Sequence, residues 1–477
     1  MSELLIFVFI LALWHVILFF GHSLGISVLL FMVPLLIYLY RVLSKNNKIK
    51  NWYGLLLSVP IVLLSLHYLL FNNNTFNVLN YIVILILLLL MFILTVKPTY
   101  KFNEIFFDFA KFIYKPFNYI GEFYKEHFRK AFKKIKLSDK GKRLLKTLLI
   151  ILPIVCIILL LLSKADPLFK ELFRVIIDTI VSIFKFEFID KLLGKIFMFI
   201  IMTFVIGIST MYLIKDYGNE KYKVKESKFK DIYTVKVLIT VLNVIYLIFD
   251  FIQIKSLFSF GSINCNHCVD YASYARSGFF ELLVVSLINM TIILISKKYK
   301  TDKSNTKYMN IMNIVMIFLT MIIIISSFIR MHFYEVAYGY TVLRLLVDVV
   351  LITEVLLMIP TVMYIINSNF NISKSFIIII ISVYCCVSLI NVDYLVASKN
   401  INRYYNGSDL DIKYLETYTT DNIPVLINLY KNTDDSDIKF ELRNYFKIVY
   451  ENNKINSWEE FNFSKYRAIK QLEKIGL

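Results

Sequence analysis

Long apolar runs separated by shorter polar segments are the dominant pattern along this chain. The runs are rich in Ile, Leu, Phe and Val, and polar and apolar residues do not alternate in them as they do in β-barrel strands. A run of about 20 apolar residues crosses the hydrocarbon layer of a bilayer as a helix, because a helix pairs its own backbone groups in lipid. We therefore predict an all-α fold, a polytopic transmembrane helix bundle with about eleven spans. The predicted spans are residues 4–20, 24–43, 53–71, 76–96, 147–164, 193–214, 233–257, 279–296, 309–329, 343–366 and 374–391.

Lys and Arg are concentrated in alternate connections between these runs. Residues 97–146 contain fourteen Lys or Arg against five acids, and residues 215–232 and 297–308 contain six and five more. The positive-inside rule assigns these connections to the cytoplasm. The N-terminus is then predicted to be cytoplasmic and, after an odd number of spans, the C-terminus extracytoplasmic.

Composition divides the chain into four predicted parts. Residues 1–100 form an N-terminal four-span region, 101–146 a basic amphipathic cytoplasmic segment, and 147–391 a seven-span core. Within the core, residues 166–192 are expected to form an amphipathic helix on the outer side, beginning at Asp-Pro. Residues 392–477, called the tail below, contain thirteen acids and twelve bases and are too polar to span. The tail is predicted to be a small, soluble helical domain outside the cell.

Local signals in the tail predict where its helices begin and end. Asn406-Gly407 indicates a helix end, and Asp421 before Pro424 indicates a helix start. In the last helix the spacing of Tyr466, Ile469 and Leu472 predicts one shared apolar face.

Six ionisable residues fall at the predicted outer ends of three consecutive spans. They are Arg276, Glu281, Arg330, Glu335, Arg344 and Asp348. Desolvated charges tend to be matched, because an unpaired buried charge costs several kcal/mol. Arg344 and Asp348 are one helical turn apart, so they share a face and are able to pair. This polar cluster is interpreted either as a structural ion-pair network or as a binding site for a ligand or partner.

Two acids lie deeper in the predicted spans. Glu354 is ten residues past Arg344, about 15 Å along a helix, close to the predicted midplane, and Asp250 lies in the outer half of its span. An acid at that depth is costly unless it has a partner, faces water or takes up a proton. The two acids are therefore either a proton or cation site or structural acids bonded within the bundle.

Other chemistry is poorly supported. Cys265 and Cys268 have the spacing of half a zinc site, but no second ligand pair is apparent, and a local disulfide fits better if their loop faces an oxidising side. No phosphate-binding loop, zinc-protease motif or nucleophile elbow occurs, so no catalytic residue, cofactor or metal is predicted. The net charge of +18 comes with no nucleic-acid recognition motif, so nucleic acid is not an expected partner.

Several stretches resemble an uncharacterised bacterial family of polytopic membrane proteins, a domain of unknown function numbered forty-one seventy-three. The stretches are Ser163–Phe169, Tyr271–Leu283, Arg330–Leu346, Asn402-Arg403 with Gly407 and Asp409–Asp411, and Phe461–Arg467. The likeness runs from about residue 150 to the end. It implies a multi-pass protein of the bacterial plasma membrane, and it implies no activity.

These observations support three hypotheses for function. The first is a non-enzymatic sensing or scaffolding protein, in which the polar cluster and the tail bind a ligand or an envelope partner, and the basic segment binds lipid or a cytoplasmic partner. The second is a secondary transporter that uses Asp250 and Glu354. The third is an intramembrane transferase acting on lipid-linked substrates, with Glu281 or Glu335 as base.

Overall fold

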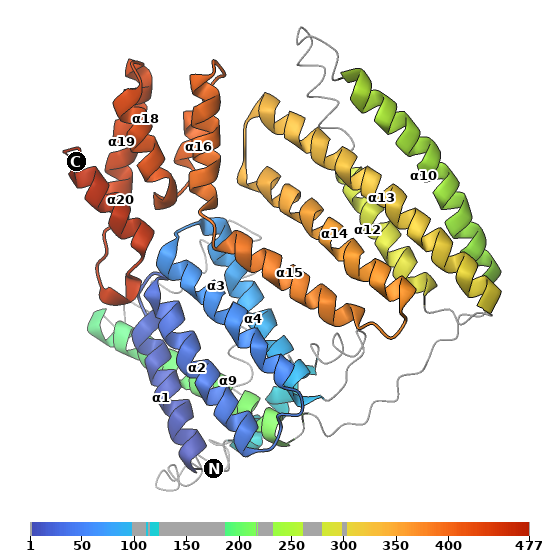
Figure 1. Ribbon diagram of the computed structural model, residues 1–477. Coiled ribbons are helices and arrows are strands. Elements are labelled where there is room, and N and C mark those ends of the chain that lie inside the picture. The colour runs from blue at the N-terminus through green and yellow to red at the C-terminus, as the bar shows by residue number, and fades with distance from the viewer. Residues whose placement is uncertain are drawn as a thin grey trace, which may run out of the picture. The chain divides into compact units, whose positions relative to one another are not determined.

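The computed structural model describes only part of the chain. The described residues are 2–97, 111–112, 115–123, 187–215, 217, 232–260, 279–297 and 303–476. All regular elements in these ranges are helices, as the apolar runs predicted (Figure 1). The predicted span 147–164, most of the amphipathic segments 101–146 and 166–192, and the loop with Arg276, Cys265 and Cys268 lie outside the described residues.

Contacts divide the chain into two compact units. The first unit comprises Met1–Ser23, Leu30–Leu55 and Phe92–Glu220, and the second comprises Leu24–Leu29, Leu56–Met91 and Lys221–Leu477. This division differs from the four parts predicted from composition, which stay a prediction.

In the first unit, α1 packs along α9. Its elements are α1 (Ser2–Phe19), most of α2 (Ile26–Lys45), η2 (Lys115–Tyr119), α6 (Ile120–Phe123) and α9 (Glu187–Lys215). The Tyr38 hydroxyl of α2 bonds the Thr210 hydroxyl of α9 at 3.0 Å. Lys215 Nζ pairs with Glu122 Oε1 at 2.5 Å, which joins the end of α9 to α6. These contacts satisfy polar groups that α2 and α9 carry among apolar side chains.

In the second unit, the long helix α13 packs against α10, α12 and α14 (Figure 1). These helices are α10 (Ile232–Phe260), α12 (Phe279–Ser296), α13 (Lys303–Tyr338) and α14 (Val342–Ile366). Met316 and Ile324 of α13, Leu351 and Met358 of α14 and Ile293 of α12 are buried in their shared core. This core positions the acids considered below.

The helix α15 (Ile372–Ser388) follows α14 and packs against both α14 and α3 (Ser58–Leu70). Before α3 comes η1 (Trp52–Leu57), and after it comes α4 (Asn74–Val96). The Asn80 side chain of α4 bonds the Ser388 hydroxyl and accepts from the Tyr384 hydroxyl at 2.8 Å, which fixes α4 against the end of α15.

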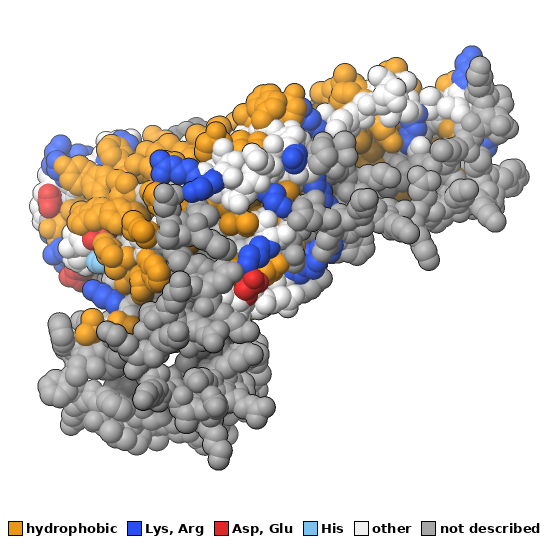
Figure 2. Space-filling model, turned by 90° about the horizontal axis from the view of Figure 1, so that it is seen from below, with side chains coloured by type: hydrophobic (Ala, Val, Ile, Leu, Met, Phe, Trp, Pro, Cys, Tyr) orange, Lys and Arg blue, Asp and Glu red, His pale blue; other side chains and the backbone are white. Residues whose placement is uncertain are grey.

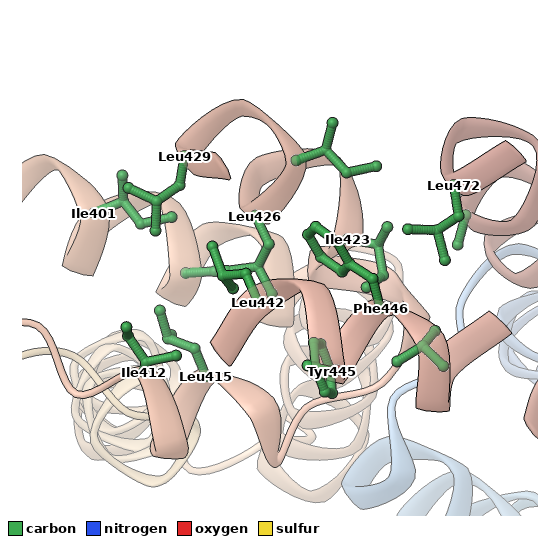
Figure 3. Packing of buried hydrophobic residues seen from close by; sticks show 14 of the residues in the cluster. Ile401, Ile412, Leu415, Ile423, Leu426, Leu429, Leu442, Tyr445, Phe446 and Leu472 are labelled. Atoms are coloured by element: carbon green, nitrogen blue, oxygen red, sulfur yellow. The ribbon is translucent and has the colours of Figure 1, made fainter. Parts of the chain in front are cut away.

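The tail helices enclose a separate hydrophobic cluster (Figure 3). They are α16 (Val392–Tyr405), α17 (Ile412–Glu416), η5 (Thr420–Asn422), α18 (Ile423–Asn432), α19 (Ser436–Asn452), η6 (Trp458–Glu460) and α20 (Phe463–Glu473). Leu426 of α18, Leu442 and Phe446 of α19 and Leu472 of α20 are completely buried in it. The tail helices therefore share a hydrophobic core, while a separate C-terminal domain stays a prediction.

The structure confirms two of the local signals in the tail and corrects the third. α16 ends at Tyr405, and Gly407 follows with a φ of +89°, a value that suits glycine. Pro424 lies in the first turn of α18. The predicted face of the last helix is wrong: Ser464 and Ala468 are buried with Leu472, whereas Tyr466 is 39% exposed.

Helices long and apolar enough to cross a membrane are present in the described part of the chain. There are five, or up to six if α15 and α16, which meet at a bend of 62°, form one span. Hydrophobic side chains also gather on the described surface (Figure 2). On α10, for example, Leu247, Ile248 and Phe251 are 57–69% exposed, as expected for side chains that face lipid. The protein is therefore a membrane protein, while the number of about eleven spans stays a prediction.

Candidate functional site

Buried polar side chains join three helices in the core of the second unit. The Tyr246 hydroxyl of α10 donates to Asn289 Oδ1 of α12 at 2.7 Å. The Ser286 hydroxyl of α12 donates to Glu354 Oε2 of α14 at 2.6 Å. Ser286 and Asn289 are three residues apart and therefore lie on one face of α12.

The directions of the helices bring Asp250 to the same level as Ser286 and Glu354. Hydrogen bonds between side chains and neighbouring helices fix the directions: Thr240 with Tyr308, Asn243 with Met312, Asn289 with Thr320, and Ser296 with Asn313. α10 therefore runs parallel to α13, α12 runs antiparallel to it, and α10 and α12 are antiparallel to each other. Asp250 is four residues after Tyr246 and Ser286 three before Asn289, so both lie about one turn from that bond in the same direction. We call Asp250, Ser286 and Glu354 the acid layer.

The two carboxyl groups of the acid layer are buried and only partly bonded. Glu354 is 2% exposed and Asp250 3% exposed. Glu354 Oε1 and both side-chain oxygens of Asp250 accept no hydrogen bond within the described residues. A bare carboxylate in such surroundings costs several kcal/mol, which a proton or a bound cation removes.

The four described members of the polar cluster lie where α13 ends and α14 begins. Arg330 and Glu335 are 6% and 4% exposed. The Arg344 guanidinium donates to the Gly339 carbonyl and lies over the Tyr334 ring, 4.3 Å from its centroid. Arg344 thus contacts the turn between the two helices; its spacing from Asp348 had allowed a pair with that residue.

Helix α16 of the tail contacts this same turn. The Asn400 side chain accepts from Tyr340 N and donates to Tyr340 O, both at 2.8 Å. Arg403 donates to the last carbonyls of α13, to Val336 O at 3.1 Å and to Ala337 O at 3.0 Å. We call Lys399, Asn400 and Arg403 the α16 clasp.

The clasp also supplies a positive charge to the polar cluster. Lys399 lies over the Tyr340 ring, 4.3 Å from its centroid, and its charge attracts that of Glu335, as does Arg344. Lys399 and Asn400 carry no signal in the sequence, and Arg403 falls only within a stretch of family resemblance. No periodic signal connects residues that lie sixty positions apart in the chain.

A third polar group attaches the tail to α3 and α4. Asn72 N donates to Asp421 Oδ1 and Oδ2 at 3.1 and 2.9 Å. Asn73 Nδ2 donates to Asp393 Oδ1 at 2.5 Å, and the Asn462 side chain donates to the carbonyls that end α3. We call Asn72, Asn73, Asp393, Asp421 and Asn462 the tail joint.

The two acids of the tail joint, Asp393 and Asp421, follow α15 in the chain. Their hydrogen-bond donors Asn73 and Asn72 are uncharged. Burial raises the pKa of Asp421 to about 6, although hydrogen bonds from Ser464 and Asn72 lower it. Burial and then the nearby charge of Asp421 raise the pKa of Asp393 to about 7. Both acids are therefore easier to bury as neutral carboxyl groups than as carboxylates.

The remaining predicted site residues are not described. Arg276, Cys265 and Cys268 lie outside the described residues, as does the side chain of Glu281. Within the described ranges, no group of three or more His, Cys, Asp or Glu side chains is arranged to hold a metal ion.

Comparisons with known proteins give one match. Residues 58–429 match a family described as Domain of unknown function (DUF4153). The matched range begins at the first residue of α3 and ends in α18, so it includes the acid layer and the α16 clasp. The sequence resemblance had indicated a different family, the one numbered forty-one seventy-three. Both families are domains of unknown function, so the prediction of an uncharacterised family is confirmed. No curated protein and no solved structure matches the chain.

Proposed function

We propose that this chain, which belongs to the DUF4153 family, is a secondary transporter whose ion site is the acid layer. Protonation or cation binding at Glu354 and Asp250 would couple to movement of α14 against α12. The observation that carries the proposal is the burial of two carboxyl groups with three oxygens that accept no hydrogen bond within the described residues. Structural acids are generally bonded through both oxygens, because an unsatisfied one costs about 1–3 kcal/mol.

The helix that carries Glu354 also has a weak point close to it. Pro360 lies inside α14, six residues after Glu354. Proline cannot donate the backbone hydrogen bond that residue 360 would otherwise make, so α14 bends most easily there. A change of charge at Glu354 that weakens its bond from Ser286 therefore acts on a helix that is already predisposed to move.

The proposal includes the membrane topology predicted from charge. Its elements are about eleven spans in the plasma membrane of a bacterium, a cytoplasmic N-terminus and an extracytoplasmic tail. A cysteine introduced at position 276 tests it in a variant whose five native cysteines are replaced by serine, because a membrane-impermeant thiol reagent added to intact cells is expected to label it. Labelling only after the cells are opened would reverse the topology.

Infrared difference spectroscopy tests the ion site directly. The purified protein in lipid nanodiscs is expected to show a protonated-carboxyl band that disappears as the pH rises. Glu354→Gln should remove only the component of that band that Glu354 contributes, because Asp250, Asp393 and Asp421 contribute components of their own. Glu451→Gln, which makes the same chemical change at an exposed position of α19, should leave the band unchanged. A band that is unchanged in Glu354→Gln, together with no heat of sodium binding, would remove the ion site.

Flux tests the transport. Proteoliposomes that carry a pH-sensitive dye inside and a potassium–valinomycin potential are expected to acidify faster than protein-free liposomes. Glu354→Gln should abolish the difference, and Glu451→Gln should preserve it. Equal rates for the native chain and Glu354→Gln would exclude proton transport through the acid layer.

The α16 clasp supports a second function, sensing or scaffolding. Through Asn400 and Arg403, the tail holds the turn between α13 and α14, so a ligand or an envelope partner bound to the tail would act on the bundle. Variants Arg276→Ala and Glu335→Ala that fold normally and leave every envelope-stress response unchanged would count against this function.

A further inference from the structure

Three aromatic side chains are exposed around the start of the last helix. Trp458 of η6 is 53% exposed, and Phe463 and Tyr466 of α20 are 51% and 39% exposed. Lys470 lies over the Tyr466 ring, 4.5 Å from its centroid. The side chains that bind α20 to the tail core, by contrast, are Ser464, Ala468 and Leu472. Trp458, Phe463 and Tyr466, called the aromatic patch below, thus expose 39–53% of their surface outside the tail core.

The backbone between these aromatics is fixed to the ends of two candidate spans. Ile26 N, at the start of α2, donates to Phe461 O at 2.9 Å. The Asn462 side chain donates to Tyr68 O and Phe71 O, where α3 ends, at 2.8 and 2.7 Å. α2 and the η1–α3 segment are both long and apolar enough to cross a membrane. The chain around residues 458–466 is therefore held at the level where these spans leave the hydrocarbon.

The backbone at Gly25, just before α2, lies directly against the backbone of Glu460 and Phe461. A Cβ on Gly25 would lie 2.7 Å from the backbone of Glu460 and from Phe461 O. No L-residue with a side chain fits there unless the chain moves. The distance from the aromatic patch to the start of α2 is thus fixed by the fold.

We propose that the aromatic patch inserts into the lipid headgroup layer and rests the tail on the membrane surface. Trp and Tyr favour this layer because one end of each side chain is apolar and the other forms hydrogen bonds. Lys470 adds a positive charge beside the rings, which complements anionic headgroups. The occupant of the aromatic patch is then lipid, and the tail has one face toward the bilayer. This inference does not depend on the ion site.

Tryptophan fluorescence of the full chain tests the inference. The chain has three tryptophans, Trp14, Trp52 and Trp458, so Trp14→Phe with Trp52→Phe leaves Trp458 as the only emitter. The protein is reconstituted in bilayers of phosphatidylcholine and phosphatidylglycerol with bromine on the acyl chains near the headgroup. The emission of Trp458 is expected to be strongly quenched by these lipids and to be protected from acrylamide in the water.

A matched control places the single tryptophan at a different exposed position of the tail. Trp458→Phe with Phe440→Trp, in the same background, puts it on α19 at a position that is 68% exposed. Residue 440 lies twelve residues, about 18 Å along a helix, before the end of α19, so it should be quenched by acrylamide and not by lipid.

Two outcomes would overturn the proposal. One is a Trp458 that is quenched by acrylamide and untouched by brominated lipid. The other is a Trp458 shielded from both, which would assign the aromatic patch to a second protein chain.

Discussion

Replacing Asp421 by asparagine is expected to remove a pH dependence from the attachment of the tail. Burial raises the pKa of Asp421 from its ordinary value of 3.8 to about 6. The folded state therefore binds the proton more tightly than the unfolded state does. The stability that results is fully present below about pH 4 and is lost as the pH rises through about 6.

The magnitude follows from the size of the shift. The difference between about 6 and 3.8 corresponds to about 3 kcal/mol, at about 1.4 kcal/mol for each pH unit. The side chain is only 2% exposed, so solvent screens little of this energy. An asparagine side chain at position 421 would stay neutral and keep an oxygen that accepts from Asn72 N, so the variant should resist rising pH.

Urea unfolding of the tail, followed by Trp458 emission in the variant without Trp14 and Trp52, measures this effect. The midpoint for the native Asp421 should fall between about pH 4 and about pH 7. Asp421→Asn should flatten the slope, both by removing its own titration and by removing the negative charge that raises the pKa of Asp393.

Either of two results would refute this pH dependence. A native midpoint that rises with pH would mean that the sign is wrong. A slope that is identical in Asp421→Asn and the native chain would mean that another group carries the proton.

Three further substitutions test the contacts of the tail. Gly339→Ala should destabilise the protein by about 1–3 kcal/mol, because residue 339 has a φ of +85° and its Cβ would lie 2.7 Å from Arg403 Nη1; a thermal midpoint equal to that of the native chain would contradict this. Arg403→Ala should cost about 1–3 kcal/mol through two lost hydrogen bonds, and Arg403→Lys should recover only part of the midpoint, since lysine lacks the planar fork. Asn462→Ala leaves two carbonyls at the end of α3 without their donor, so protease should cut the tail at lower concentrations, while Asn456→Ala, in the preceding loop, should leave the cleavage unchanged.

The helical fold was predictable because hydrophobic runs carry a strong signal. The predicted span 309–329 lies within α13, but α13 continues to Tyr338. Hydropathy ended the span at the polar residues Arg330, His332 and Glu335. The helix nevertheless continues through Arg330 and Glu335, which are 6% and 4% exposed, and composition alone does not report such burial.

The candidate site was only partly predictable. Depth along a helix identified Glu354 and Asp250, because an acid among apolar residues is conspicuous. Their common level depends on the directions of α10 and α12, which become evident only from bonds such as that of Tyr246 with Asn289. The tail joint was not predictable, because the sequence around Asp421 indicates only the start of a helix. Its hydrogen-bond partner Asn72 lies far away in the chain.

Only three residues separate α15 from α16, and the two helices meet at 62°. Because the connection is this short, a rotation of α15 would carry α16 with it. α16 has fourteen residues and is about 21 Å long, so a 10° tilt of α15 would displace its far end by about 4 Å. That displacement exceeds the length of a hydrogen bond, so even a modest tilt would pull Arg403 off the carbonyls of α13.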